Sequence, residues 1–178
     1  MYYSALKKLD IANGPGVRMT LFVSGCTNHC EGCFQPETWD FQHGTPFTEK
    51  TLEEILAGLA LPYVQGFTLL GGEPMEPRNQ PDVHRLLERI RWSMPKKDIW
   101  IFSGFTFERL LTPGEYPNTP HVRSILELAD VLVDGPFILA QKDLLLRFRG
   151  SKNQRLLDLP ASLQRMQPVL WDDHYQRH

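Results

Sequence analysis

The sequence predicts an α/β fold, a partial (β/α) barrel built on a curved parallel sheet. Short apolar runs typical of buried strands alternate with longer segments whose apolar residues recur at helical spacing, which is the pattern of repeated βα units. The chain has 178 residues, of which 42% are hydrophobic, and this suits one well-cored domain. A complete eight-fold barrel needs about 250 residues, so the barrel must be partial.

The first βα unit is expected after a glycine- and proline-containing turn at residues 13–16. Residues 17–23 are predicted to form a short strand that leads into a cysteine-containing loop. Thr48 is placed to cap the following helix, whose apolar side chains share one face: Leu52, Ile55, Leu56 and Leu59. The cysteine loop is therefore expected at the carboxyl end of a strand.

Three more strands are expected at residues 67–70, 98–102 and 131–133. Helices are expected from about Pro81 to Met94, at residues 105–111 and at residues 122–129. A last strand is expected at residues 156–159, so the core of the domain is expected to span residues 10–159. We expect one domain over residues 1–178, with a partly ordered tail at residues 160–178 that contains a short helix near residues 162–166.

The four expected parallel strands each end at a glycine that lies beside a residue able to do chemistry. Because the carboxyl ends of parallel strands meet at one edge of a sheet, these loops should border a common site. The pairs are Gly25–Cys26, Gly72–Glu73, Ser103–Gly104 and Asp134–Gly135.

Composition argues against several classes of partner. The net charge of -2 gives no general attraction to nucleic acid or to an acidic membrane. The first eight residues lack the apolar segment of a signal peptide, and the most apolar stretch, residues 55–64, contains Gly58 and Pro62 and is too short to span a bilayer. We therefore expect a cytoplasmic protein with no nucleic-acid or membrane partner.

The three cysteines of the chain, Cys26, Cys30 and Cys33, lie within eight consecutive residues. The spacing CxxxCxxC lets one short loop fold three sulfurs around a common centre, which indicates a metal rather than structural packing. An iron–sulfur cube held by three thiolates leaves one iron open to a small-molecule ligand, as a catalytic metal site leaves a coordination position open.

Two other interpretations remain open from the spacing. A zinc ion could be held by the three cysteines and one histidine, with His29 or His43 as the fourth ligand. A disulfide is disfavoured because the number of cysteines is odd and the chain carries no secretory signal.

A second motif favours the iron–sulfur interpretation. The CxxxCxxC loop after one apolar strand, with Gly-Gly-Glu-Pro at residues 71–74 after another, resembles the radical S-adenosylmethionine superfamily. Within it, Asn-Gly-Pro-Gly-Val-Arg at residues 13–18, Gly-Cys-Phe at residues 32–34 and Trp39 resemble the glycyl radical activating enzymes of anaerobic ribonucleotide reductase. The resemblance covers residues 10–155 approximately. The aromatic residue usual before the third cysteine is absent, and this variant matches the activase group.

The resemblance implies a partial barrel of the radical SAM type and a reaction. Cys26, Cys30 and Cys33 would bind three irons of a 4Fe-4S cluster, leaving the fourth for S-adenosyl-L-methionine. Reductive cleavage of that molecule would give a 5′-deoxyadenosyl radical, which would generate a glycyl radical on the large subunit of anaerobic ribonucleotide reductase. A low-potential electron donor of the flavodoxin or ferredoxin type is also implied.

The resemblance also suggests residues that bind the cofactor. Gly71 and Gly72 lack a Cβ, so backbone groups there can approach the methionine ammonium, while Glu73 can accept from that cation or fix the loop. The backbone from Gly32 to Phe34 can form hydrogen bonds with the edge of the adenine ring.

Three further side chains have competing interpretations. Phe34 is a candidate for stacking on adenine and equally for core packing. Ser103 and Asp134 lie at the same predicted edge, where each could bind the cofactor or cap a turn, and Asp134 is favoured as a ligand.

Rival functions share parts of this pattern. A radical enzyme acting on a small molecule, such as a 7-carboxy-7-deazaguanine synthase, would need its own polar pocket, and residues 32–34 and 149–151 favour the activase. A non-enzymatic zinc module gives no reason for the motif at residues 71–73. A basic cluster is interpreted as a solvated face, a partner contact or a carboxylate clamp: Arg147, Arg149, Lys152 and Arg155.

Overall fold

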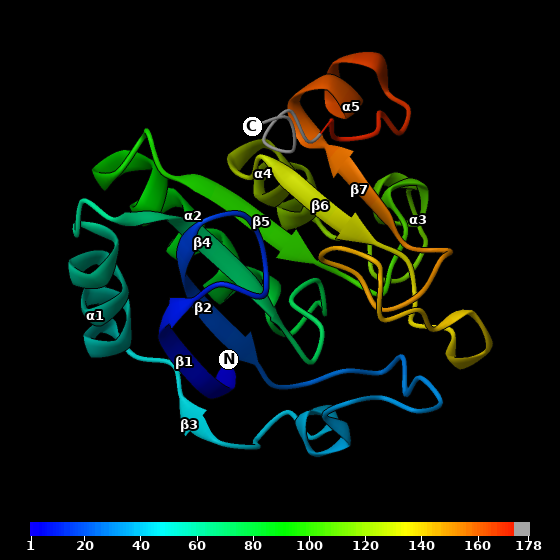
Figure 1. The fold of residues 1–178 in the computed structure, drawn as a ribbon, viewed down its shortest axis with the longest axis horizontal. Helices are drawn as coiled ribbons and strands as arrows, with labels where there is room; N and C mark the ends of the chain where they lie inside the picture. The colour runs from blue at the N-terminus through cyan, green and yellow to red at the C-terminus, as the bar shows by residue number, and fades with distance from the viewer. Residues whose placement is uncertain (173–178) are drawn as a thin grey trace.

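A mixed seven-stranded sheet organises the computed structural model, which describes residues 1–172 (Figure 1). The strand order is β3-β1-β2-β4-β5-β6-β7, and the sheet does not close into a barrel. The central pairs β2–β4, β4–β5 and β5–β6 are parallel, whereas β1–β2, β1–β3 and β6–β7 are antiparallel. The strands are β1 (Tyr2–Asp10), β2 (Val17–Val23), β3 (Thr45–Pro46), β4 (Val64–Gly71), β5 (Asp98–Phe102), β6 (Val131–Asp134) and β7 (Arg155–Asp158).

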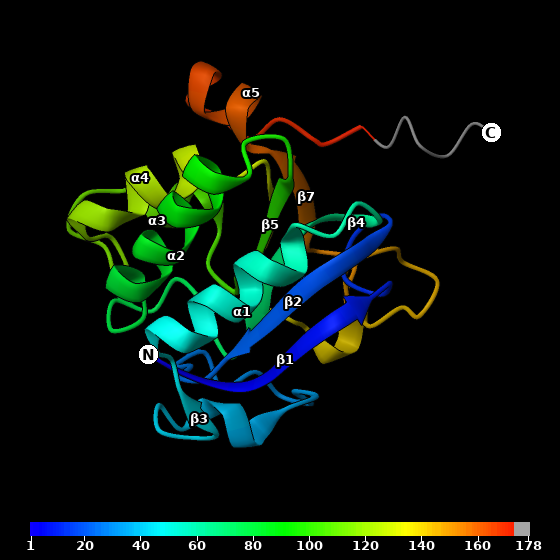
Figure 2. The same cartoon turned by 90° about the vertical axis from the view of Figure 1, so that its left-hand side faces the viewer.

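Helices cover one face of this sheet, as Figure 2 shows for α1 to α4. Their apolar side chains pack with those of β2, β4 and β5 in one buried cluster. In α1, Thr48 and Thr51 form a reciprocal capping box, so the predicted cap is confirmed. The helices are α1 (Glu49–Leu59), α2 (Gln80–Ser93), α3 (Phe107–Leu111), α4 (Pro120–Leu128) and α5 (Leu159–Arg165), with 3-10 turns η1 (Pro36–Trp39) and η2 (Leu139–Gln141).

The expectation of a parallel sheet is correct for the centre and wrong for its edges. The N-terminal segment forms β1, which the sequence did not predict, and a loop of six residues returns the chain to pair antiparallel with β2. The last strand, β7, also runs antiparallel to β6, because the segment between them contains no crossover helix. The architecture is thus α/β with a mixed, open sheet.

The segment expected as a partly ordered tail packs against the sheet as far as the structure describes it. Asp158 caps α5 by accepting from the backbone N–H of Ala161, and the Trp171 N–H donates to the carbonyl of Leu156 at 2.8 Å. The Trp171 ring lies 4.9 Å from that of Trp100. Residues 173–178 of the expected tail lie outside the described residues. None of the helices within residues 1–172 has the length and apolarity that a membrane span requires.

A fully buried arginine holds the loop between β1 and β2 against the face of the sheet opposite the helices. Arg18 forms an ion pair with Asp98 and donates from Nε to the Thr68 hydroxyl at 2.6 Å and from Nη1 to the carbonyl of Pro15 at 3.2 Å. The Thr68 hydroxyl in turn donates to the carbonyl of Asn13 at 2.8 Å. This loop, dark blue in front of β4 in Figure 1, becomes one wall of the cavity described next.

Candidate functional site

The predicted meeting of strand ends is found at the carboxyl edge of the parallel strands. The loops that follow β2, β4, β5 and β6 border a cavity of about 500 Å³. Asn13 and Phe22 contribute to its wall beside the strand ends. The predicted residues that line it are Cys26, Cys30, Cys33, Phe34, Gly71, Gly72, Glu73 and Ser103, whereas Gly32 and Asp134 do not.

All three thiols are free, and Cys26 is buried while Cys30 and Cys33 are half-buried. Burial, with a smaller contribution from the charge of Glu73, raises the pKa of the Cys26 thiol to about 12, and burial also raises the pKa of Cys30. In the described part of the chain, no three His, Cys, Asp or Glu side chains are already gathered at metal-binding distances. A bound cluster would stabilise the thiolate form of these cysteines against the raised pKa values.

The two histidines considered for a zinc site do not line the cavity. The His29 ring stacks on Trp39 with 4.5 Å between ring centroids, and neither His29 nor His43 lines the cavity. The structure thus gives the Cys3His zinc interpretation no support from the placement of these two histidines. The donor set suits a metal centre that keeps one position open.

The start of the cysteine loop is held by η1 through backbone bonds. The N–H of Gly25 donates to the carbonyl of Thr38 at 2.8 Å, and that of Cys26 donates to Trp39 at 3.2 Å. Gly25 has a φ of +96°, and a Cβ there would come within 2.2 Å of the Phe41 ring. Glycine is therefore required immediately before the first cysteine.

Glu73 is fully buried and accepts four hydrogen bonds from three strand-end loops. One carboxylate oxygen accepts from the N–H of Met75 and the hydroxyl of Ser103, both at 2.9 Å. The other accepts from the N–H of Gly104 at 2.7 Å and the amide of Asn28 at 3.1 Å. Burial raises the pKa of Glu73 to about 7 even though its hydrogen bonds lower it. Of its two predicted roles, this geometry favours fixing the loops.

A second buried carboxylate, Glu76, supports the cysteine loop from behind and was missed from the sequence. One oxygen accepts from the N–H of Thr27 at 2.8 Å and from its hydroxyl at 2.7 Å, directly after Cys26. The other bonds to the Tyr116 hydroxyl, and burial together with this bond raises the pKa of Tyr116 to about 12. The only local signal was its place three residues after Glu73.

The two glycines of the second motif are needed for close backbone packing. Gly71 has a φ of +112°, and a Cβ there would lie 2.6 Å from the backbone of Val23. A Cβ on Gly72 would lie 2.8 Å from the carbonyl oxygen of Gly25 and 2.9 Å from that of Thr38. Any side chain at residue 72 would therefore push on the start of the cysteine loop as well as into the cavity.

Phe34 and Asp134 differ in how they relate to the cavity. Phe34 is 67% exposed, so it is not a core residue, and its ring lies 5.4 Å from Phe137 at the cavity wall. Asp134 is fully buried behind the wall, where it accepts from the N–H of Phe107 at 2.8 Å and from Arg155. Its carboxylate thus ties the end of β6 to α3 and β7.

The basic cluster is divided among different partners. Arg155 pairs with Asp134 and Glu108, which raise its pKa, and Lys152 lies 3.7 Å from Asp143. Arg149 lines the cavity and donates to the carbonyl of Gln154 at 2.9 Å. These residues do not form one uniform solvated face.

Comparison with known proteins agrees with this geometry. Residues 12–157 match the profile of the 4Fe-4S single cluster domain family. The chain is 41% identical over 156 residues to the anaerobic ribonucleoside-triphosphate reductase-activating proteins of Salmonella typhimurium and Escherichia coli, covering 86% of this chain and 96% of each relative. It is 37% identical over 158 residues to that of enterobacteria phage T4, covering 88% of this chain and 93% of the relative. The chain therefore belongs to the family of anaerobic ribonucleoside-triphosphate reductase-activating proteins, which carry a 4Fe-4S domain.

Proposed function

We propose that this chain activates an anaerobic ribonucleotide reductase through a 4Fe-4S cluster and S-adenosyl-L-methionine. The observation that carries the proposal is the placement of all three cysteines of one loop beside the Gly71–Gly72 backbone in a single cavity. That arrangement occurs in a chain 41% identical to activating proteins over most of its length. The cluster would supply one electron for reductive cleavage of S-adenosyl-L-methionine to methionine and a 5′-deoxyadenosyl radical. That radical would take a hydrogen atom from a glycine of the reductase, giving 5′-deoxyadenosine and a glycyl radical.

The residues of the chain then divide into ligands and supports. Cys26, Cys30 and Cys33 would hold the cluster, and the backbone at Gly71 and Gly72, which lines the same cavity, would bind the methionine end of S-adenosyl-L-methionine. Phe34, at the cavity wall, is positioned to cover the adenine, and the backbone from Gly32 leads to it. Two buried carboxylates act as positioning residues rather than ligands: Glu73 and Asp134.

The partial barrel of the radical SAM type suits this reaction. The four central parallel strands deliver their loops to one side of the cavity, and residues 1–178 act as one domain with its core at residues 10–159. The partners are the reductase large subunit and a low-potential donor of the flavodoxin or ferredoxin type. Nucleic acid is not a partner, since the net charge is -2 and Arg155 and Lys152 are paired within the chain. The setting is cytoplasmic.

The test mixes the reconstituted protein anaerobically with a reductant, S-adenosyl-L-methionine and the reductase large subunit from the same source. We expect a doublet electron paramagnetic resonance signal that collapses to a singlet when the glycine of the reductase is deuterated at Cα. Deuterium should appear in 5′-deoxyadenosine, and Cys33→Ala should give neither signal nor product. Cofactor cleavage without the doublet would instead support a radical enzyme that acts on a small molecule.

A further inference from the structure

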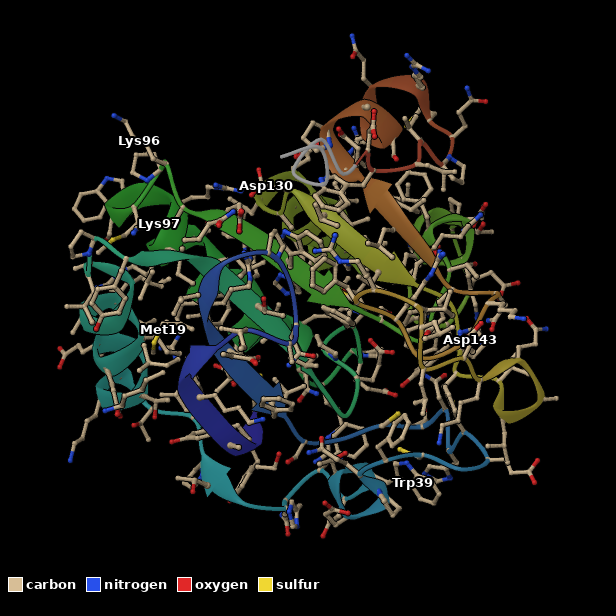
Figure 3. All side chains as sticks on the ribbon, in the orientation of Figure 1. Met19, Trp39, Lys96, Lys97, Asp130 and Asp143 are labelled. Atoms are coloured by element: carbon tan, nitrogen blue, oxygen red, sulfur yellow. The ribbon has the colours of Figure 1, made fainter. Side chains whose placement is uncertain are left out.

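The segment between β6 and β7 forms a hairpin beside the cavity. The N–H of Asp143 donates to the carbonyl of Gly150 at 3.2 Å, that of Lys152 donates to Gln141 at 3.0 Å, and a β-bridge joins Lys142 to Ser151. Gly150, at the base of this hairpin (residues 142–151), lines the cavity. In Figure 3 the labelled Asp143 lies on the same side of the molecule as Trp39, which stacks on the cysteine loop.

The tip of the hairpin exposes two consecutive leucines. Leu144 is 84% exposed and Leu145 is 92% exposed, although burying a leucine is worth about 1.5–3 kcal/mol. Of the thirteen exposed large hydrophobic residues within residues 1–172, five lie on two segments that border the cavity. We call these five the apolar rim: Phe34, Ile138, Leu139, Leu144 and Leu145.

The two sides of the apolar rim are in contact with each other. Leu139 packs on the backbone at Gly32, since its Cδ1 lies 2.9 Å from where a Cβ of Gly32 would be. The Lys142 ammonium lies 5.0 Å from the centroid of the Phe34 ring. The cysteine loop therefore contacts the segment that leads into the hairpin, beside the cavity. Scattered surface leucines are ordinary, but exposed apolar side chains gathered on two touching segments beside a site indicate an interaction surface.

The hairpin also differs from the rest of the chain in charge. Residues 142–151 carry three basic side chains and one acidic one, whereas the whole chain has a net charge of -2. A second copy of the chain docking symmetrically would bring two positive hairpins together, which is unfavourable. The charge instead complements a partner with acidic side chains next to its apolar ones.

We propose that the apolar rim docks the glycine-bearing region of the reductase large subunit, through apolar side chains flanked by acidic residues. The inference rests on the proposed function, because a hydrogen atom taken from a protein backbone requires that backbone to reach the cavity. The cysteine loop and the hairpin present the apolar rim beside the cavity, and the partner docks over it. Burial of Leu144 and Leu145 against the partner then contributes to the affinity that holds the two proteins together.

The experiment compares two variants with the reconstituted wild-type protein. The double variant Leu144→Glu/Leu145→Glu alters only the tip of the hairpin. The matched control is Trp92→Glu, which changes an equally exposed residue (83%) in α2 that lines a separate surface groove with Arg89 and Leu128. Affinity for the reductase large subunit is measured by biolayer interferometry under anaerobic conditions, at low and at high salt.

The double variant should bind the reductase at least about tenfold more weakly, as loss of central apolar contacts does, and should generate less glycyl radical. Trp92→Glu should behave as wild type. Cleavage of S-adenosyl-L-methionine without reductase should be unchanged in both variants, and wild-type affinity should fall as salt rises.

Wild-type affinity in the double variant would overturn the docking proposal and leave the proposed function standing. A changed oligomeric state of the activating protein alone, with reductase affinity intact, would assign the rim to a second copy of this chain and also overturn it. If the wild-type protein cleaves the cofactor yet gives no glycyl radical, the proposed function itself fails.

Discussion

Replacing Glu73 by glutamine should destabilise the fold before it affects cofactor binding. The carboxylate has four donors around it, and a glutamine side chain offers one acceptor oxygen and one donor group in the same volume. If the amide oxygen of the glutamine keeps the hydrogen bonds from Met75 and Ser103, the amide NH2 group faces two other donors, the N–H of Gly104 and the amide of Asn28. Asn28 can turn its own oxygen inward, but the backbone N–H of Gly104 has no such freedom and loses its acceptor.

The expected cost follows from that count of donors. An unsatisfied buried donor costs about 1–3 kcal/mol. The raised pKa of Glu73 shows that its buried charge is itself unfavourable, so a neutral glutamine adds no further loss and Glu73→Gln should lower the free energy of unfolding by about 1–3 kcal/mol. Asn28→Ala is the matched control, since it removes a single donor to Glu73 and should cost about 1 kcal/mol.

The assay is urea unfolding of the cluster-free protein under anaerobic, reducing conditions, followed by titration of S-adenosyl-L-methionine onto the reconstituted protein. Neutral surface substitutions change the free energy of unfolding by no more than about 0.5 kcal/mol. If Glu73→Gln changes the free energy of unfolding by no more than this but sharply weakens the affinity for S-adenosyl-L-methionine, then the carboxylate binds the cofactor. That result would refute the assignment of Glu73 as a residue that fixes the loops.

Three further predictions concern the cluster, the second motif and a surface ion pair. Substituting alanine for any one of the three cluster ligands, Cys26, Cys30 and Cys33, should abolish iron binding and cofactor cleavage. A single variant with wild-type iron content would contradict this ligand set. Gly72→Ala should lower cluster content as well as cofactor affinity, because its Cβ meets the carbonyl of Gly25; an intact cluster with weak cofactor binding would contradict this. Glu108→Gln should cost about 0.2–1 kcal/mol at pH 7, as exposed pairs do. Arg155 lowers the pKa of Glu108 from 4.5, so the ion pair stabilises the fold only while Glu108 is ionised, and the cost of the substitution should disappear as the pH falls through the lowered pKa. An equal cost at pH 3 and pH 7 would contradict a role for the ion pair.

The central βα units could be predicted because their signals are local. The strands at residues 17–23 and 98–102 have the bounds of β2 and β5, since each is a short apolar run ended by glycine or a turn. The N-cap at Thr48 likewise depends only on neighbouring residues. The position of the site could also be predicted from the sequence, because parallel strands bring their carboxyl ends to one edge of the sheet.

The edges of the sheet could not be predicted because long-range pairing creates them. β1 is half-buried or exposed along most of its length and contains Lys7 and Lys8, so it lacks the alternation of a strand with one buried face. The burial of Arg18 could not be predicted, because an arginine is rarely buried unless it is paired, and its partners are distant in the sequence. Its partners Thr68 and Asp98 lie 50 and 80 residues away along the chain.

The roles of the strand-end carboxylates show the same limit at the site itself. Glu73 and Asp134 each follow a strand and adjoin a glycine, so the sequence presents both as candidate ligands. In the structure both are fully buried with their oxygens occupied, one by donors from three loops and the other by Arg155 and the N–H of Phe107. The cavity is lined by the three thiols, by glycines such as Gly71 and Gly72 whose backbone a cofactor can approach closely, and by aromatic and amide side chains. A substitution at either carboxylate should therefore alter loop geometry first and chemistry only through it.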